Sequence, residues 1–297
     1  MQYVIDLQKT TSLSELVPIL SEILETQEKT VCINLKLADY NKLPYLLCIV
    51  AAVNKARNKG VTVKISGDPP NPYLQRINFY KELGVECTES FTRHDPAGRF
   101  LEISHMTEET SNETVTRIIK ILEEQMLLPQ NLLKCLNYCF WEVIDNIHEH
   151  ADSPIGGYAV AQYYPQKRII EIVIVDTGRG IFNSLRENPQ YASYSEQEAI
   201  ECCIKQGYTR GNAGRGNGLF HTTRFIQESR GMFCLYSGNY AISIGAKRQK
   251  TWKLPHWQGT IILMKLRPNV SVNLENIFGN EVPVSVDEYD DLINGLW

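Results

Sequence analysis

The chain has 297 residues, which is enough for two modest domains or one large one, and its 43% hydrophobic and 22% charged residues are typical of a soluble globular protein. The formal net charge of -4 disfavours a nucleic-acid partner, because proteins that bind phosphate backbones usually carry a surplus of basic residues. No apolar run approaches the roughly 18 residues that a membrane span needs and no secretory signal opens the chain, so we expect a cytoplasmic protein without a membrane partner.

The first 90 residues alternate between short runs of strand-forming residues and segments with apolar positions at helical spacing. The expected strands are 3–7, 29–37 and 61–67, and the expected helices are 12–27, 43–60 and 71–84. This alternation predicts a small α/β layer structure in residues 1–90. Residues 91–99 are polar and contain Gly and Pro, which is typical of a linker.

Residues 100–267 predict an α+β sandwich, in which a mixed sheet carries helices on one face. The expected strands are 99–105, 156–164, 168–176, 232–237, 240–246 and 259–267, and the expected helices are 111–126, 130–151, 195–206 and 219–229. The basic segment 245–253 is expected to be a solvated loop between two strands. Residues 268–297 form an acidic tail to which the pattern assigns no structure.

One predicted helix carries the segment EVIDNIHEHA, which places Glu142, Asn146 and His150 at successive four-residue steps. On a helix these three side chains share a strip at the edge of an apolar arc, which is formed by Leu136, Phe140, Val143, Ile147 and Ala151. Asp145 and Asn146 are both poor helix formers and stand side by side. Taken alone, the pattern still fits an ordinary charged helix face.

A second motif, IVIVDTGRGIF, is an apolar strand that ends at Asp176 and turns through Gly178 and Gly180. Glycines adopt backbone conformations that other residues avoid, and they let a ligand approach the backbone closely. An aspartate at the end of a strand can accept a hydrogen bond from an exocyclic amine. The alternative is a plain turn from a strand into a loop.

A third motif, NAGRGNGLFHTTRF, alternates Gly214, Gly216 and Gly218 just before a predicted helix. Exposed N–H groups at a helix N-terminus attract anions such as phosphate. The alternative is a flexible loop, since neither a P-loop lysine nor a βαβ unit accompanies the glycines. A fourth segment, WQGTIILMKL, opens the last predicted strand with Gly259 and Thr260, which mean little alone.

In this order, the four motifs resemble the N box, the G1 box, the G2 box and the distal threonine of the GHKL (Bergerat-fold) ATPase superfamily, which includes gyrase, the heat-shock-90 chaperone, MutL and the histidine kinases. The resemblance covers residues 100–267 and implies a Bergerat-type α/β sandwich. The spacing Glu142-x3-Asn146-x3-His150 is most similar to the anti-sigma-factor serine kinases. Residues 1–90 resemble the STAS domains of anti-sigma-factor antagonists, which implies a protein partner or self-association through this segment.

The resemblance implies that the protein binds ATP together with Mg²⁺. Asn146 would be a magnesium ligand, Asp176 would accept a hydrogen bond from the adenine amine, and Thr260 would support that contact. Residues 183–213 would form a lid over the nucleotide. The other implied residues are glycines against the base and groups around the triphosphate, namely Gly178, Gly180, Gly214, Arg215, Gly216, Asn217 and Gly218, with Arg210 as a further candidate.

Glu142 separates two classes of function. In the hydrolysing relatives a glutamate here is the general base for water, and in the serine kinases for an acceptor hydroxyl; such bases contribute about 10² to 10⁴ in rate. The resemblance therefore implies ATP hydrolysis, or transfer of the γ-phosphate to a protein serine or threonine. The alternative function is an ATP-gated protein-binding module with little or no turnover. The alternative role of Glu142 is to help hold the magnesium shell through water.

Overall fold

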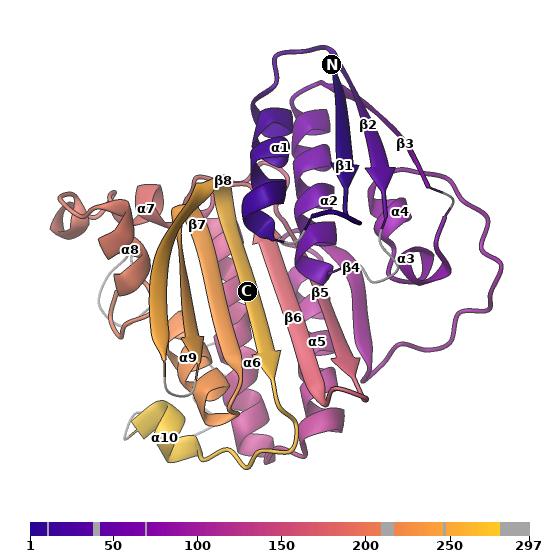
Figure 1. The fold of residues 1–297 in the computed structure, drawn as a ribbon. Coiled ribbons are helices and arrows are strands. Elements are labelled where there is room, and N and C mark those ends of the chain that lie inside the picture. The colour runs from indigo at the N-terminus through magenta and orange to yellow at the C-terminus, as the bar shows by residue number, and fades with distance from the viewer. Residues whose placement is uncertain (11, 38–41, 69, 209–216, 246–247, 280–297) are drawn as a thin grey trace.

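A computed structural model describes the chain except residues 11, 38–41, 69, 209–216, 246–247 and 280–297, and it also leaves out the side chains of residues 149 and 150. The fold is α/β: a small three-stranded parallel sheet with helices is followed by a five-stranded antiparallel sheet with helices (Figure 1). Within the described part of the chain, no helix combines the length and the apolar character that a membrane span requires.

The small sheet has the strand order β1-β2-β3 and confirms the expected alternation of strands and helices. Its strands are β1 (Gln2–Asp6), β2 (Thr30–Lys36) and β3 (Thr62–Gly67), and the crossover helices are α1 (Leu13–Glu25) and α2 (Leu43–Asn58). Parallel neighbours need such crossovers. Buried and more exposed positions alternate along β1 and β2, so one face of the sheet packs on α1 and α2.

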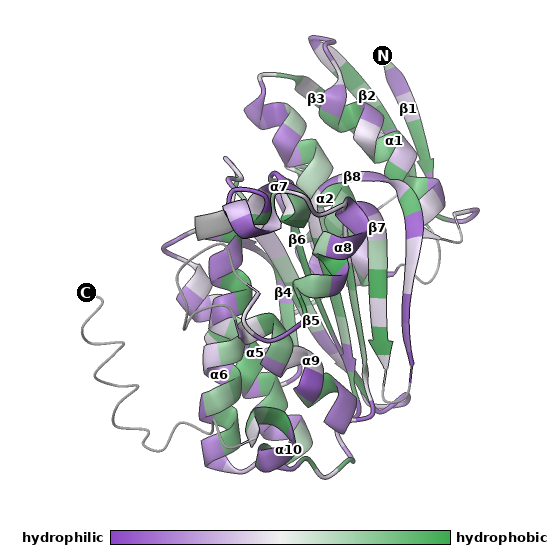
Figure 2. Ribbon diagram, turned by 90° about the vertical axis from the view of Figure 1, so that its left-hand side faces the viewer, coloured by the Kyte–Doolittle hydropathy of each residue, from purple (hydrophilic) through white to green (hydrophobic). Residues whose placement is uncertain are grey.

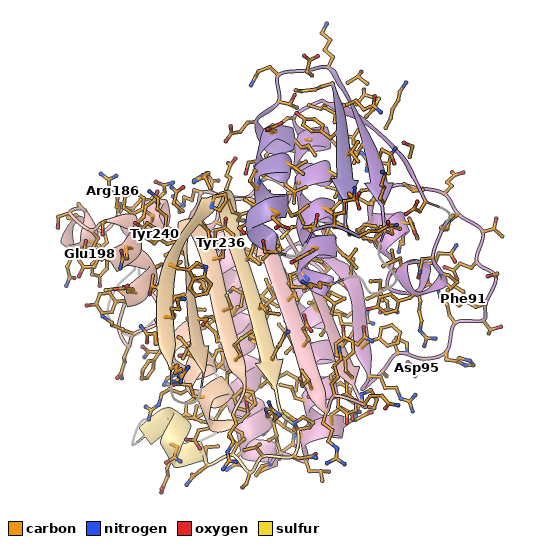
Figure 3. All side chains as sticks on the ribbon, in the orientation of Figure 1. Phe91, Asp95, Arg186, Glu198, Tyr236 and Tyr240 are labelled. Atoms are coloured by element: carbon orange, nitrogen blue, oxygen red, sulfur yellow. The ribbon has the colours of Figure 1, made fainter. Side chains whose placement is uncertain are left out.

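The single helix expected over residues 71–84 is wrong, because the structure has two short helices there. They are α3 (Pro72–Arg76) and α4 (Phe79–Glu82). Asn78 separates them in a left-handed conformation, with φ at 64°, which an asparagine tolerates better than most residues. The chain then runs through a long connection that carries Phe91 and Asp95 along the outer side of the molecule (Figure 3).

The five-stranded sheet is antiparallel at every pairing between its described strands, whereas a mixed sheet was expected. Its strand order is β4-β5-β6-β8-β7. The strands are β4 (Phe100–Met106), β5 (Gly157–Tyr164), β6 (Ile169–Asp176), β7 (Met232–Gly245) and β8 (Gln249–Leu266).

Strands β7 and β8 are longer than the sequence pattern indicated. Two expected strands form the single strand β7, with an irregular register around Gly238. The expectation of a loop at 245–253 is wrong for the described residues from Gln249 onwards, since β8 begins there. Thr251 and Trp252 pair with Ile242 and Ala241, and such cross-strand pairs stabilise a hairpin beyond the sheet proper.

One face of the five-stranded sheet is covered by the helices that carry two of the motifs. They are α5 (Ser111–Met126), α6 (Gln130–Asp145) and α9 (Gly218–Glu228), with the short α10 (Leu274–Phe278) against α9. Figure 2 shows α5 and α6 side by side on this face. Further along the chain, α7 (Gly180–Leu185), the 3₁₀ helix η2 (Pro189–Tyr191) and α8 (Glu196–Cys202) lie at the β7 edge (Figure 1).

The opposite face of the same sheet is covered by α1 and α2. Helix α1 packs on β8, and α2 packs on β5 and β6, at the upper end of the sheet in Figure 1. Every residue of α2 except Asn54, Arg57 and Asn58 is buried, as expected for a helix enclosed between two sheets. The apolar residues of 1–90 form one continuous core with this face of the large sheet, and a second core lies between its other face and α5, α6 and α9.

Candidate functional site

The EVIDNIHEHA segment ends in a π-helical turn. Helix α6 stops at Asp145, and residues Asn146–His150 form the π-turn η1, in which the Ala151 N–H donates to the Asn146 carbonyl over 2.9 Å. Such single wide turns are rare within helices and occur frequently at functional sites. Asn146, the first residue of this turn, is half-buried and lies about one helical turn beyond Glu142. The side chain of His150 lies outside the described residues.

The Asp-Thr-Gly turn packs directly on the end of that helix. The Arg179 N–H donates to the Ala151 carbonyl over 2.7 Å. A Cβ atom on Gly178 would lie only 2.7 Å from the Ala151 Cβ atom, which is closer than real contacts allow. Gly178 is therefore required for the close approach of this turn to η1, and the first two motifs are in contact.

Asp176 ends β6 and is buried, with 5% of its surface exposed. Its Oδ1 accepts the Gly178 N–H over 2.8 Å, and Thr260 donates to the same carboxylate through its hydroxyl and its backbone N–H. Burial raises the pKa of Asp176 to about 6, against the lowering effect of these hydrogen bonds and of the Lys55 charge. The second and fourth motifs thus meet at one buried carboxylate that keeps capacity to accept another donor.

Ser237 and Trp257 complete this part of the site, and the sequence interpretation missed both. The Ser237 hydroxyl accepts the Ile181 N–H over 3.0 Å and donates to the Gly259 carbonyl over 2.7 Å. The Trp257 indole N–H donates to the Asp176 carbonyl over 3.2 Å. In the sequence, the only signals for these two residues were a serine at the end of a predicted strand and a tryptophan two residues before the Gly-Thr pair.

Gly180 has φ at +77°, in the left-handed region, and a Cβ atom there would lie 2.7 Å from the Ser237 hydroxyl oxygen. Glycine is needed here for both reasons, and this residue starts α7, which contacts β7 and β8. Tyr236, the neighbour of Ser237 on β7, is labelled in Figure 3 and belongs to the core on the α1–α2 side of the sheet. Because successive side chains on a strand point to opposite faces, Tyr236 packs in the core while its neighbour Ser237 contacts the site.

Glu142 lies against the start of α9. Its Oε1 accepts a hydrogen bond from the Tyr138 hydroxyl, and its Oε2 is buried with no hydrogen-bond partner among the described residues. A Cβ atom on Gly218, the first residue of α9, would lie 2.6 Å from that Oε2. The first motif therefore contacts the third, and an unpaired carboxylate oxygen lies beside a helix N-terminus.

Asn217 precedes α9, and its side-chain carbonyl accepts the Gly207 N–H over 3.1 Å. It therefore ties Gly207, within the expected lid, to the start of α9. Four predicted residues, Arg210, Gly214, Arg215 and Gly216, lie outside the described residues.

Residues 183–208 of the expected lid are described, and they pack against β7 through α8. Glu196 on α8 accepts hydrogen bonds from the backbone N–H and the side-chain amide of Asn239 on β7. Seven residues of this segment belong to the core, namely Leu185, Tyr191, Ala199, Ile200, Cys202, Cys203 and Ile204. Arg186 and Glu198 lie on its outer side (Figure 3).

A scan of the sequence against protein-family models finds no match, and a search of curated proteins finds no significantly similar chain. The function therefore has to follow from the chemistry of the side chains. The site has one buried carboxylate with backbone donors at Asp176 and one half-buried carboxylate with an unpaired oxygen at Glu142. In addition to these two carboxylates, the Thr177 hydroxyl oxygen is fully buried and has no hydrogen-bond partner among the described residues.

Proposed function

We propose that this protein binds Mg-ATP between the end of β6 and the start of α9, and that it hydrolyses ATP or transfers the γ-phosphate to a protein serine or threonine. One observation carries the proposal: four motifs that are far apart in the sequence meet through direct contacts. Gly178 packs on Ala151, Thr260 bonds to Asp176, and Gly218 packs on Glu142. Membership of the GHKL superfamily is part of the same proposal.

The base of the nucleotide would bind at Asp176. A carboxylate with a pKa of about 6 is mostly ionised at neutral pH and accepts a hydrogen bond from an exocyclic amine. Thr260 and Gly178 hold the carboxylate, so that it is oriented before a ligand arrives. Two close-packed glycines, Gly178 and Gly259, keep side chains away from this end of the sheet.

The phosphates would bind between η1 and the first turn of α9. Helix α9 has 11 residues and begins at Gly218, and its N-terminal N–H groups favour an anion. The fit with magnesium rests on the side-chain carbonyl of the half-buried Asn146, which is an oxygen donor of the kind that Mg²⁺ prefers. When bound, the ion would neutralise charge on the phosphates.

Glu142 would act as the general base. The Tyr138 hydroxyl occupies Oε1 and fixes the carboxylate, which leaves Oε2 to accept a proton from water or from a hydroxyl. Gly218 packs against Oε2 so closely that no other residue type fits at the start of α9. This arrangement supports chemistry rather than storage of the nucleotide.

The test is release of phosphate from Mg-ATP by the wild type and by Glu142→Gln, with ATP binding measured for both. We expect turnover in the wild type, and a loss of about 10² or more in a variant that still binds ATP. Binding without turnover in both would exclude a stand-alone ATPase; transfer to added protein substrates would then separate a kinase from an ATP-gated binding module. Absence of ATP binding would refute the proposal.

A further inference from the structure

Ser111 and His148 make a side-chain contact that no part of the proposed mechanism uses. Ser111 is the first residue of α5 and is fully buried, and His148 is the third residue of the π-turn η1. The His148 Nε2 atom lies 2.7 Å from the Ser111 hydroxyl oxygen. The contact therefore joins η1 to the start of a helix that lies 37 residues earlier in the chain.

The hydroxyl of Ser111 shows which of the two side chains donates. Its single proton goes to the Thr107 carbonyl oxygen, which lies 2.7 Å away and can only accept. The Ser111 oxygen therefore accepts its other hydrogen bond from His148, so the Nε2 atom of this histidine carries a proton. The buried hydroxyl then uses both of its functions, which avoids the cost of a polar group left unpaired away from water.

The π-turn depends on contacts with its surroundings. Such a turn replaces the i→i−4 bonds of an α-helix by wider ones, and its rarity shows that a chain seldom adopts it without support. The bond that closes η1 runs from the Ala151 N–H to the Asn146 carbonyl. Two packing contacts support the turn, because Ile147 lies against Gly157 on β5 and Ala151 lies against Gly178.

The bond from His148 to Ser111 adds support from α5, at the middle of the turn. We propose that these two side chains are positioning residues for magnesium: their hydrogen bond keeps the π-turn closed and so holds Asn146, its first residue, where its side-chain carbonyl would bind the ion. This inference rests on the proposed function of the site. It gives α5, which carries none of the four motifs, a part in nucleotide binding.

The experiment measures ATP binding by calorimetry on the full chain, once with magnesium and once with EDTA. The variants are Ser111→Ala, His148→Ala, the double variant, and His148→Gln, whose amide keeps an N–H donor near the position of Nε2. Thr116→Ala is the control. Thr116 lies on the exposed side of α5, and its hydroxyl also donates to a backbone carbonyl, that of Asn112.

Magnesium should tighten ATP binding to the wild type, to His148→Gln and to Thr116→Ala. Ser111→Ala and His148→Ala should lose about tenfold in affinity with magnesium and little in EDTA, as expected for the loss of one hydrogen bond. The double variant should lose no more than either single variant, because all three lack the same bond. A purely structural role would weaken binding equally with and without magnesium.

NMR of the His148 ring tests the bond without any nucleotide. In protein labelled with ¹⁵N-histidine, its Nε2 proton should exchange slowly with water in the wild type, and its signal should be lost in Ser111→Ala. Absence of this signal from the wild type, equal losses with magnesium and with EDTA, additive losses in the double variant, or full magnesium dependence in a folded Ser111→Ala would each overturn the inference. A wild type that shows the proton signal but binds no ATP would instead refute the proposed function.

Discussion

Gly218 and Glu142 are so close that no side chain fits between them: a Cβ atom on Gly218 would lie 2.6 Å from the Glu142 Oε2 atom. Gly218→Ala must push α9 away from α6 or turn the carboxylate. We expect a loss of about 1–3 kcal/mol of stability, as for other overpacked sites, together with a marked loss of ATP binding. Denaturant unfolding and calorimetry measure the two effects.

The matched control for that variant is Gly245→Ala. Gly245 ends β7, and the nearest atoms to a Cβ placed there are 3.9 Å away, which is an ordinary contact. Its replacement should change neither stability nor binding appreciably. Equal behaviour of the two variants would show that α9 is not held against Glu142 as described.

Asp176 should make the protein less stable as the pH rises. Its folded pKa is about 6 and its unfolded pKa about 3.9, so between these values the folded state binds more protons than the unfolded state. This contribution is fully present below pH 3.9 and is lost as the pH rises through 6. We expect Asp176→Asn to stabilise the protein by about 1–3 kcal/mol at pH 7.5 and much less at pH 4.5, while it weakens ATP binding.

Unfolding curves of the wild type and Asp176→Asn across this pH range measure the effect. Asparagine keeps a carbonyl acceptor for the Gly178 N–H, so the variant tests the charge more than the hydrogen bond. A stability difference that is the same at both pH values would contradict the assignment of a raised pKa to Asp176.

Ser237 should matter although it lies outside every sequence motif. Ser237→Ala removes the acceptor for the Ile181 N–H and the donor to the Gly259 carbonyl. We expect a loss of about 1–3 kcal/mol of stability and weaker nucleotide binding, because the Gly180 turn loses its link to β8. Ser243→Ala, further along β7, is the control. Identical unfolding midpoints for these two variants would count against a special role for Ser237.

Removal of residues 1–90 should make the rest of the chain aggregate. The deletion uncovers an apolar sheet face that α1 and α2 bury, to which Val160, Val173, Val175, Trp257 and Ile261 contribute. Exposed apolar patches of this kind cause association. Light scattering and circular dichroism of fragment 91–297 test this expectation. A soluble, folded monomer would show that residues 100–267 form an independent domain.

A protein partner or self-association through residues 1–90 stays a prediction. The inner faces of α1 and α2 are already occupied by the large sheet, so a partner of this segment would have to use another surface. The outer face of the small sheet is available, since Val4, Thr62 and Lys64 are exposed there. Crosslinking between single cysteines placed on this face would detect self-association.

The sequence was most informative where local patterns decide structure. The helix expected at 111–126 matches α5 to the residue, because its apolar stripe and its break at 127–129 are local signals. Gly178, Gly180 and Gly218 each lie where a side chain does not fit. Their role as ligand contacts remains a prediction.

The remaining features depend on contacts that no local pattern encodes. Ser237 meets Gly259 and Trp257 meets Asp176 only because β8 inserts between β6 and β7, which is a property of the sheet order. The burial of Lys55 depends on a sheet that begins more than forty residues later. The nearly continuous run of apolar residues in α2 was the available signal, because a helix that is apolar all round has to be enclosed on more than one side.

The cover that α1 and α2 provide also has a consequence for synthesis. The Ser21 hydroxyl on α1 bonds to the His256 carbonyl on β8, 235 residues further along the chain. At about 5–20 residues per second, a ribosome takes roughly 12 to 47 seconds to make that interval. During this time the face of α1 that packs on β8 has no native partner, so the nascent chain should depend on a chaperone or on transient non-native contacts until β8 emerges.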